Sequence, residues 1–147
     1  MIRPLVFCFA LFGLAATAEA APVKLDKLTL GTDFEGGCGC SIWNPKGEFL
    51  FWSELGAGDP ALVKINGQLR TLKFVSSTEK SRPARLGDRF TRIYADQDAR
   101  LTIDHKTTFV CGPDDERCEV TRYDVNVFLE DHGKRARARG LKGDCGC

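Results

Sequence analysis

The chain alternates apolar and polar residues along much of its length, with the period of two that is typical of β-strands. The alternation is most regular in Cys118–Glu130, where Tyr123, Val125, Val127 and Leu129 take every second position and are separated mostly by polar residues. A strand with one face in a core and the other in solvent is therefore predicted for this segment.

Further short segments are apolar or alternating and are bounded by turn residues: Val23–Leu30, Glu48–Ser53, Ala61–Phe74, Arg89–Tyr94, Arg100–Asp104, Thr107–Cys111 and Arg135–Leu141. Within Ala61–Phe74, the dipeptide Asn66-Gly67 predicts the type I′ turn of a β-hairpin. No helical stripe interrupts these segments. The pattern predicts an all-β, disulfide-stapled fold, a small antiparallel barrel or sandwich of about 7–8 strands.

Residues 1–20 have the features of a secretory signal peptide. Arg3 supplies the positive charge, Leu5–Ala16 is an apolar run, and Ala18-Glu19-Ala20 offers small residues for cleavage. We place the cut after Ala20, so that Cys8 leaves with the signal peptide and residues 21–147 form a single β domain. The sequence therefore predicts a protein that is periplasmic or secreted from a bacterium, with no membrane attachment after cleavage.

Composition and motifs narrow the classes of function. The formal net charge is +1, which gives no general attraction to nucleic acid. The chain contains no nucleophile elbow, zincin helix or phosphate-cradling glycine loop. Its two histidines, His105 and His132, lie in turn-like or strand-edge contexts. We expect a binding protein that is not an enzyme, has no cofactor and does not bind nucleic acid.

Two Cys-Gly-Cys motifs lie near the start and at the end of the predicted domain. Residues two apart on a strand share a face, so each motif presents two thiols together. If the strands that carry the motifs pair, directly opposed cysteines lie at a separation that a disulfide spans. An even number of cysteines in an exported chain favours disulfides. Their connectivity is left open among Cys38, Cys40, Cys111, Cys118, Cys145 and Cys147.

Two other chemistries are open to the same motifs. The four thiolates of Cys38, Cys40, Cys145 and Cys147 could converge on one soft metal ion, Zn²⁺ or Cu⁺. A bridge within one Cys-Gly-Cys motif would instead close a small, strained ring, which is typical of a disulfide that exchanges readily. Metal binding and thiol–disulfide redox activity are therefore the alternatives to a purely structural role.

Three segments resemble the central part of the bacterial periplasmic inhibitors of c-type lysozyme. They are ALVKINGQLRTL (Ala61–Leu72), SSTEKSRPARLGDRF (Ser76–Phe90) and ARLTI (Ala99–Ile103). Members of that family are small β-barrels in which a hairpin leads into an exposed loop that enters the lysozyme cleft. The Cys-Gly-Cys pair is not part of that family's pattern. In this respect the chain is similar to uncharacterised exported bacterial proteins with GCGCS early and KGDCGC last.

The resemblance implies a binding loop and a partner. It places the inhibitory loop at Ser76–Arg89, with Ser81, Arg82 and Arg85 as contacts to acidic groups of a lysozyme. The sequence therefore predicts a protein partner such as a lysozyme.

Overall fold

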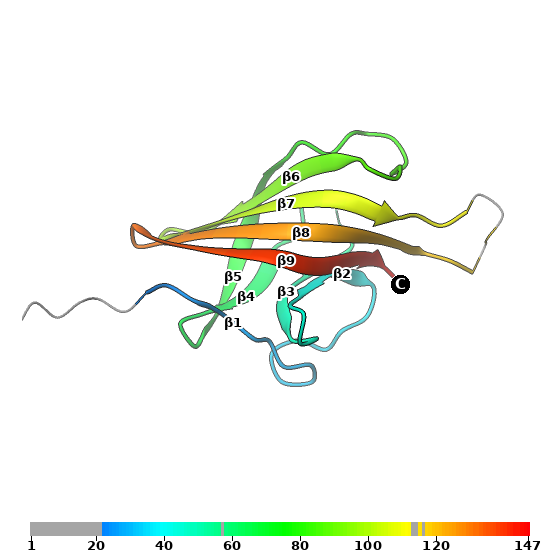
Figure 1. Cartoon of the computed structure of the whole chain (residues 1–147). Helices are drawn as coiled ribbons and strands as arrows, with labels where there is room; N and C mark the ends of the chain where they lie inside the picture. Colours follow the sequence, from blue (N-terminus) through cyan, green and yellow to red (C-terminus); the bar gives the residue numbers. More distant parts are fainter. Residues whose placement is uncertain (1–21, 57, 113–114, 116) are drawn as a thin grey trace, which may run out of the picture.

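In the computed structural model, which describes residues 22–56, 58–112, 115 and 117–147, the chain folds into an all-β protein (Figure 1). The predicted signal peptide lies outside the described residues. The described strands are β1 (Leu25–Asp26), β2 (Gly39–Trp43), β3 (Phe49–Glu54), β4 (Ala61–Ile65), β5 (Gln68–Ser77), β6 (Arg89–Ala95), β7 (Ala99–Phe109), β8 (Val120–Asp131) and β9 (Lys134–Gly146). The described part of the chain contains no helix that is long and apolar enough to span a membrane.

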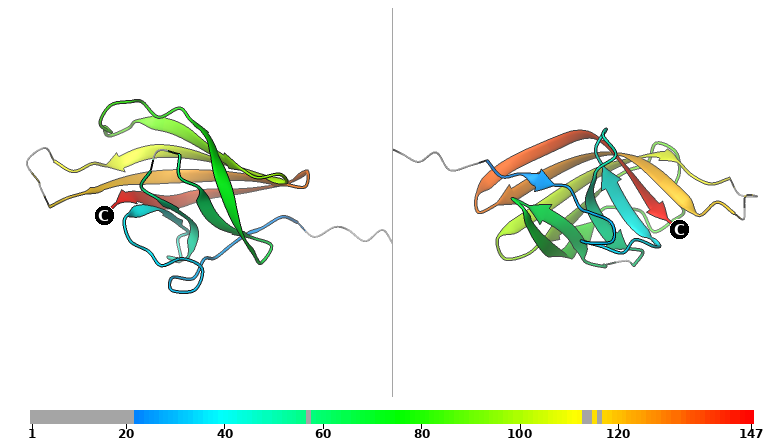
Figure 2. Two further views of the ribbon diagram at one scale, coloured as in Figure 1. Left: turned by 180° about the vertical axis from the view of Figure 1, so that it is seen from behind. Right: turned by 90° about the horizontal axis from the view of Figure 1, so that it is seen from below.

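The strands form one antiparallel sheet that closes on itself. The order is β4-β3-β2-β9-β8-β7-β6-β5, and β5 pairs again with β4 to complete a barrel, whose curving wall is visible in Figure 2. The short β1 continues the edge of β4 beyond β3, because Leu25 pairs with Ile65 whereas β3 pairs at Ala61 and Leu62. The predicted all-β, disulfide-stapled fold is confirmed, and of the two predicted architectures it is the barrel.

The barrel interior is filled by the apolar residues that alternate along the strands. Leu101 and Ile103 of β7 and Val125 and Val127 of β8 are each at most 2% exposed. Removing this apolar surface from water is the main favourable contribution to folding. The alternation predicted for Cys118–Glu130 is confirmed, because it selects the residues that face the core.

The predicted hairpin over Ala61–Phe74 is also confirmed. Ile65 pairs with Gln68 across the turn. Asn66 and Gly67 have φ angles of 48° and 80°, and a type I′ turn needs a positive φ at both positions. The Asn-Gly dipeptide therefore determines where β4 ends and β5 begins.

Some predicted strand bounds are wrong. Arg100–Asp104 and the first three residues of the predicted Thr107–Cys111 segment belong to one strand, β7, which continues through His105 and Lys106 and ends at Phe109. His105 is buried within this strand because its ring faces the core. The last strand extends five residues beyond the predicted Leu141, as far as Gly146, because its end pairs with both β2 and β8. Only Leu25–Asp26 of the predicted Val23–Leu30 segment is a named strand.

The two ends of the barrel are built differently. At one end, on the left in Figure 1, short turns join β4 to β5, β6 to β7 and β8 to β9. The opposite end carries the longer connection 78–88 and the described parts of the connections between β3 and β4 and between β7 and β8, and the C-terminus lies there too. We call these the turn end and the loop end.

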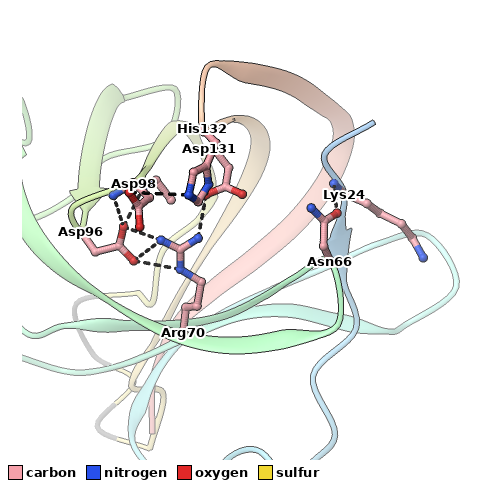
Figure 3. A network of polar contacts seen from close by, with 8 residues as sticks. Lys24, Asn66, Arg70, Asp96, Asp98, Asp131 and His132 are labelled. Atoms are coloured by element: carbon pink, nitrogen blue, oxygen red, sulfur yellow. Dashed lines mark hydrogen bonds and ion pairs between the residues drawn. The ribbon is translucent and has the colours of Figure 1, made fainter. Parts of the chain in front are cut away.

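A network of charged groups fastens the turn end (Figure 3). Arg70 of β5 donates from Nε to Asp96 at 2.9 Å and from Nη1 to Asp131 at 2.7 Å. Asp96 also accepts the backbone N–H groups of Asp98 and Ala99. One guanidinium therefore ties together β5, the β6–β7 turn and the end of β8.

Two disulfides join β2 to β9 at the loop end. Cys40 lies directly opposite Cys145 in the strand register and is bonded to it, and Cys38 is bonded to Cys147. The third bridge, between Cys111 and Cys118, closes the connection between β7 and β8. Three disulfides are typical of proteins in an oxidising extracellular or periplasmic environment.

The glycine of each Cys-Gly-Cys motif is needed because it faces away from the cysteines, against a close neighbour. A Cβ on Gly39 would lie 2.5 Å from the Ser53 carbonyl oxygen and 2.5 Å from a carbon of the Trp52 indole. A Cβ on Gly146 would overlap the backbone of Glu119. The motif therefore combines two cysteines on one face, of which Cys40 is buried and Cys38 and Cys147 are exposed, with a position on the other face that has no room for a side chain.

We predict that Gly39→Val lowers the free energy of unfolding by about 2–3 kcal/mol, because the new side chain forces Trp52 and β3 outward. Chemical denaturation measures this loss. Gly112→Val is the matched control, since a Cβ there meets no atom within 4 Å, and its effect should stay within about 0.5 kcal/mol. An equal loss in both variants would contradict the explanation.

Candidate functional site

The connection 78–88 at the loop end is held by an ion pair within it. Arg82 donates to both carboxylate oxygens of Asp88, at 2.7 and 2.8 Å, and to the Pro83 carbonyl at 2.9 Å. The Arg82 guanidinium holds the pKa of the Asp88 carboxyl below its usual value. The same carboxylate also accepts the backbone N–H of Arg85 at 2.9 Å. This bidentate pair fixes the course of the loop between its two strands.

Backbone hydrogen bonds anchor both ends of this loop to the barrel. Thr78 donates its N–H to the Thr91 carbonyl at 3.0 Å. At the other end, Gly87 donates to the Thr107 carbonyl and Thr107 donates to the Asp88 carbonyl, each at 2.9 Å. The loop therefore has a defined shape on the barrel.

The carboxylates of this loop form ion pairs within the protein, whereas most of the cationic side chains in and beside the loop are exposed to solvent. Asp88 pairs with Arg82, and Glu79 pairs with Arg92 at 2.5 Å. Lys80, Arg85 and Arg89 are exposed and form no ion pair with any described residue. Leu86, beside Arg85, is 67% exposed. We call Lys80, Arg85, Leu86 and Arg89 the basic loop surface.

The structure separates the three residues that the resemblance selected. Ser81 and Arg85 are exposed, whereas Arg82 is half-buried and bound to Asp88. Arg85 is therefore free to contact a partner, and Arg82 holds the loop that presents it.

A pocket of about 570 Å³ opens at the mouth of the barrel beside this loop. Arg92 lies in its wall, with Tyr94 and Tyr123 among the neighbouring side chains. Burial raises the pKa of both tyrosines, so their hydroxyls are protonated at neutral pH. We call this the mouth pocket; its remaining wall includes Phe74 and the Cys40–Cys145 disulfide.

Sequence reasoning missed Arg92, although a signal for it existed. Phe90, Arg92 and Tyr94 occupy every second position of β6 and therefore share a face. Phe90 and Tyr94 are core residues. An arginine between two inward aromatic residues is unusual, because long charged side chains are rarely buried without a partner.

His105 is buried beneath this mouth. Its ring stacks on Phe90 with 4.5 Å between centroids and meets the edge of Tyr123 at 5.3 Å. Burial, reinforced by the positive charge of Arg92, lowers the pKa of His105 to about 3. Its Nδ1 atom has no hydrogen-bond partner among the described residues. The imidazole is therefore neutral at physiological pH and is shielded from solvent.

A larger hollow than the mouth pocket, of about 810 Å³, lies elsewhere, on the outer face of β2 and β3. Its aromatic residues contact one another: Phe34 stacks on Trp52 at 5.0 Å and meets Phe49 edge-on at 5.5 Å. These contacts attach the segment before β2 to the outside of the barrel. We interpret this cluster as packing.

All four thiols of the Cys-Gly-Cys motifs are used in disulfides between the motifs. Zn²⁺ or Cu⁺ binding would first require both bridges to be reduced. In the described residues, no group of three or more histidine, cysteine, aspartate or glutamate side chains is arranged to hold a metal ion. The redox interpretation required a disulfide within a single motif, and that pairing is wrong because both disulfides join one motif to the other.

These features define a disulfide-linked antiparallel β-barrel with a basic loop surface and a pocket at the same end. Comparison with protein families, curated proteins and solved structures found no match for this chain.

Proposed function

We propose that this protein is a non-enzymatic binding module that acts in the bacterial periplasm or outside the cell. Its contact surface is the basic loop surface, and its partner is a protein with an acidic cleft. The resemblance to lysozyme inhibitors of the segments Ala61–Leu72, Ser76–Phe90 and Ala99–Ile103 selects c-type lysozyme as that partner.

The charge distribution of the loop is the observation that carries this proposal. Both of its carboxylates are paired inside the protein, whereas Lys80, Arg85 and Arg89 face solvent without a counter-ion among the described residues. Exposed cations favour an acidic surface and accelerate association with it. Leu86 adds an apolar side chain next to Arg85, which suits a cleft better than a flat surface.

The anchoring of the loop also supports binding. Holding a loop in one shape before contact reduces the entropy that is lost on association. The Arg82–Asp88 pair and the backbone bonds to Thr78 and Thr107 have this effect here. The inhibitors that the sequence resembles insert an exposed loop in the same way.

The test is inhibition of a c-type lysozyme by the purified protein at low ionic strength. We expect inhibition that weakens as salt is added, because screening reduces attraction between exposed charges. Arg85→Glu should weaken it at least about tenfold, since one attractive contact becomes a repulsive one. Arg139→Glu is the matched control, because Arg139 is exposed on β9 and outside the loop.

The role of Arg82 is separated from that of Arg85 by amide hydrogen exchange. Arg82→Ala should speed exchange at Gly87, because the loop loses its internal brace, and Arg85→Ala should not. Absence of inhibition by the wild-type protein would refute lysozyme as the partner. Equal inhibition by the wild type and Arg85→Glu would refute the basic loop surface as the contact.

A further inference from the structure

Arg92 places a positive charge inside the mouth of the barrel. It lies on the inward face of β6, and its side chain is only 18% exposed. The guanidinium carbon lies 5.2 Å from the centroid of the Phe90 ring. Burial opposes the charge, but the pair with Glu79 more than offsets this and raises the pKa of Arg92. The pocket therefore contains a permanent cation.

The guanidinium has one carboxylate partner among the described residues. Nη2 donates to Glu79 at 2.5 Å, whereas Nη1 faces Cys40 Sγ at 3.5 Å and Cys145 Sγ at 3.8 Å. The Tyr94 hydroxyl also interacts with this guanidinium. Sulfur is a weak acceptor. An arginine fork is matched by a carboxylate that accepts from both of its terminal nitrogens. Arg92 has such an acceptor on one side and disulfide sulfurs on the other.

Glu79 is the group that a ligand would replace. Its side chain is 36% exposed, twice the exposed fraction of Arg92. It lies where β5 passes into the loop 78–88. If the Glu79 carboxylate leaves Arg92, it can turn into water and does not become an unpaired buried charge. Exchanging it for the carboxylate of a ligand therefore keeps one negative charge against Arg92.

We infer that the mouth pocket is a binding site for a small organic carboxylate with an aromatic or aliphatic body, whose carboxylate takes the place of Glu79 on Arg92. The body of the ligand would lie against Phe74 and Tyr94, which line the same pocket. A volume of about 570 Å³ is within the usual range for small-molecule sites. This site adjoins the basic loop surface, with which it shares Lys80, but it does not depend on the proposed partner.

Charge favours a carboxylate over a phosphate here. Arg92 is the deep cation of the pocket, Lys80 lies at its rim, and Glu54 and Glu119 also line it. A single guanidinium balances one negative charge. A phosphate monoester carries nearly two at neutral pH and would leave part of its charge unpaired beside the two glutamates.

The probes are phenylacetate, its neutral analogue phenylacetamide, and phenyl phosphate, titrated separately into the protein with its disulfides intact. Binding is measured by calorimetry and located by the NMR shifts of Tyr94 and Tyr123. We expect phenylacetate to bind at least about tenfold more tightly than the amide, because charge-assisted hydrogen bonds are the stronger ones. Tighter binding of phenyl phosphate would overturn the assignment to carboxylates.

Two variants test the roles of the ion pair. Glu79→Gln should strengthen phenylacetate binding about threefold or more, because the competing carboxylate is gone. Arg92→Met should abolish it, whereas Arg139→Met, at an exposed arginine of β9 that lines neither the pocket nor the loop, should leave it unchanged. If Arg92→Met does not fold, Arg92→Lys, which keeps the charge but loses the fork, replaces it and should weaken binding. Equal binding of acid and amide, or no gain in Glu79→Gln, would overturn the inference.

Discussion

Removing both disulfides between β2 and β9 is expected to destabilise the protein by about 5–7 kcal/mol, which is more than the sum of the two single removals. The bridges have sequence separations of 105 and 109 residues and lie side by side. Either one alone closes nearly the same long loop, so the second restricts only a short extra ring. A single removal should therefore cost about 2 kcal/mol or less in chain entropy.

The measurement is a double-mutant cycle by denaturant unfolding of Cys38→Ala/Cys147→Ala, of Cys40→Ala/Cys145→Ala, and of the fourfold variant. Cys40 is buried, so its removal also loses packing, but this contribution cancels in the coupling energy of the cycle. Cys111–Cys118 is kept in every variant as the internal control. Two single losses that simply add to the fourfold loss would contradict the shared-loop explanation.

Acid is expected to destabilise the wild-type protein more than His105→Phe. His105 has a pKa of about 3 when folded and an ordinary value near 6.5 when unfolded. As the pH falls below about 6.5, the unfolded chain takes up a proton that the folded chain refuses. Stability is therefore lost from that point, and the loss is complete near pH 3. Between pH 7 and 4.5 it amounts to about 2–3 kcal/mol.

The experiment compares the free energies of unfolding of both proteins at pH 7 and at pH 4.5. Phenylalanine keeps the stack on Phe90 and removes the unpartnered Nδ1, so the two stabilities should be similar at pH 7. Other groups titrate equally in both proteins, which leaves the difference to His105. Identical acid losses would show that His105 does not stay neutral when folded.

The strands followed from local rules, whereas the disulfide connectivity did not. Alternation along Cys118–Glu130 predicted a half-buried strand, and Asn66-Gly67 predicted a turn, because each depends on neighbouring residues only. Bridges between the two motifs were one of three interpretations, because opposed residues on paired strands lie close enough to bond. Their connectivity stayed open because the pairing of β2 with β9 joins residues that are distant in sequence.

The site depends on contacts between residues that are distant in sequence or that fold back on one another. Arg82 was selected as a partner contact by the resemblance to lysozyme inhibitors, but the loop returns Asp88 to its guanidinium. The role of Arg92 was missed because it depends on its contacts with the Cys40–Cys145 disulfide and with Glu79. These groups approach Arg92 from β2, from β9 and from the end of β5. Burial and pairing of this kind are set by the closed barrel.

The central claim is that the loop end of the barrel is the binding end. NMR shift mapping of the labelled protein, titrated with unlabelled c-type lysozyme, tests this directly. We expect the chemical-shift changes to be concentrated in residues 78–89 and their neighbours at the loop end. We expect no changes at the turns 66–67, 96–98 and 132–133. Changes centred on those turns, or none anywhere at saturating lysozyme, would contradict it.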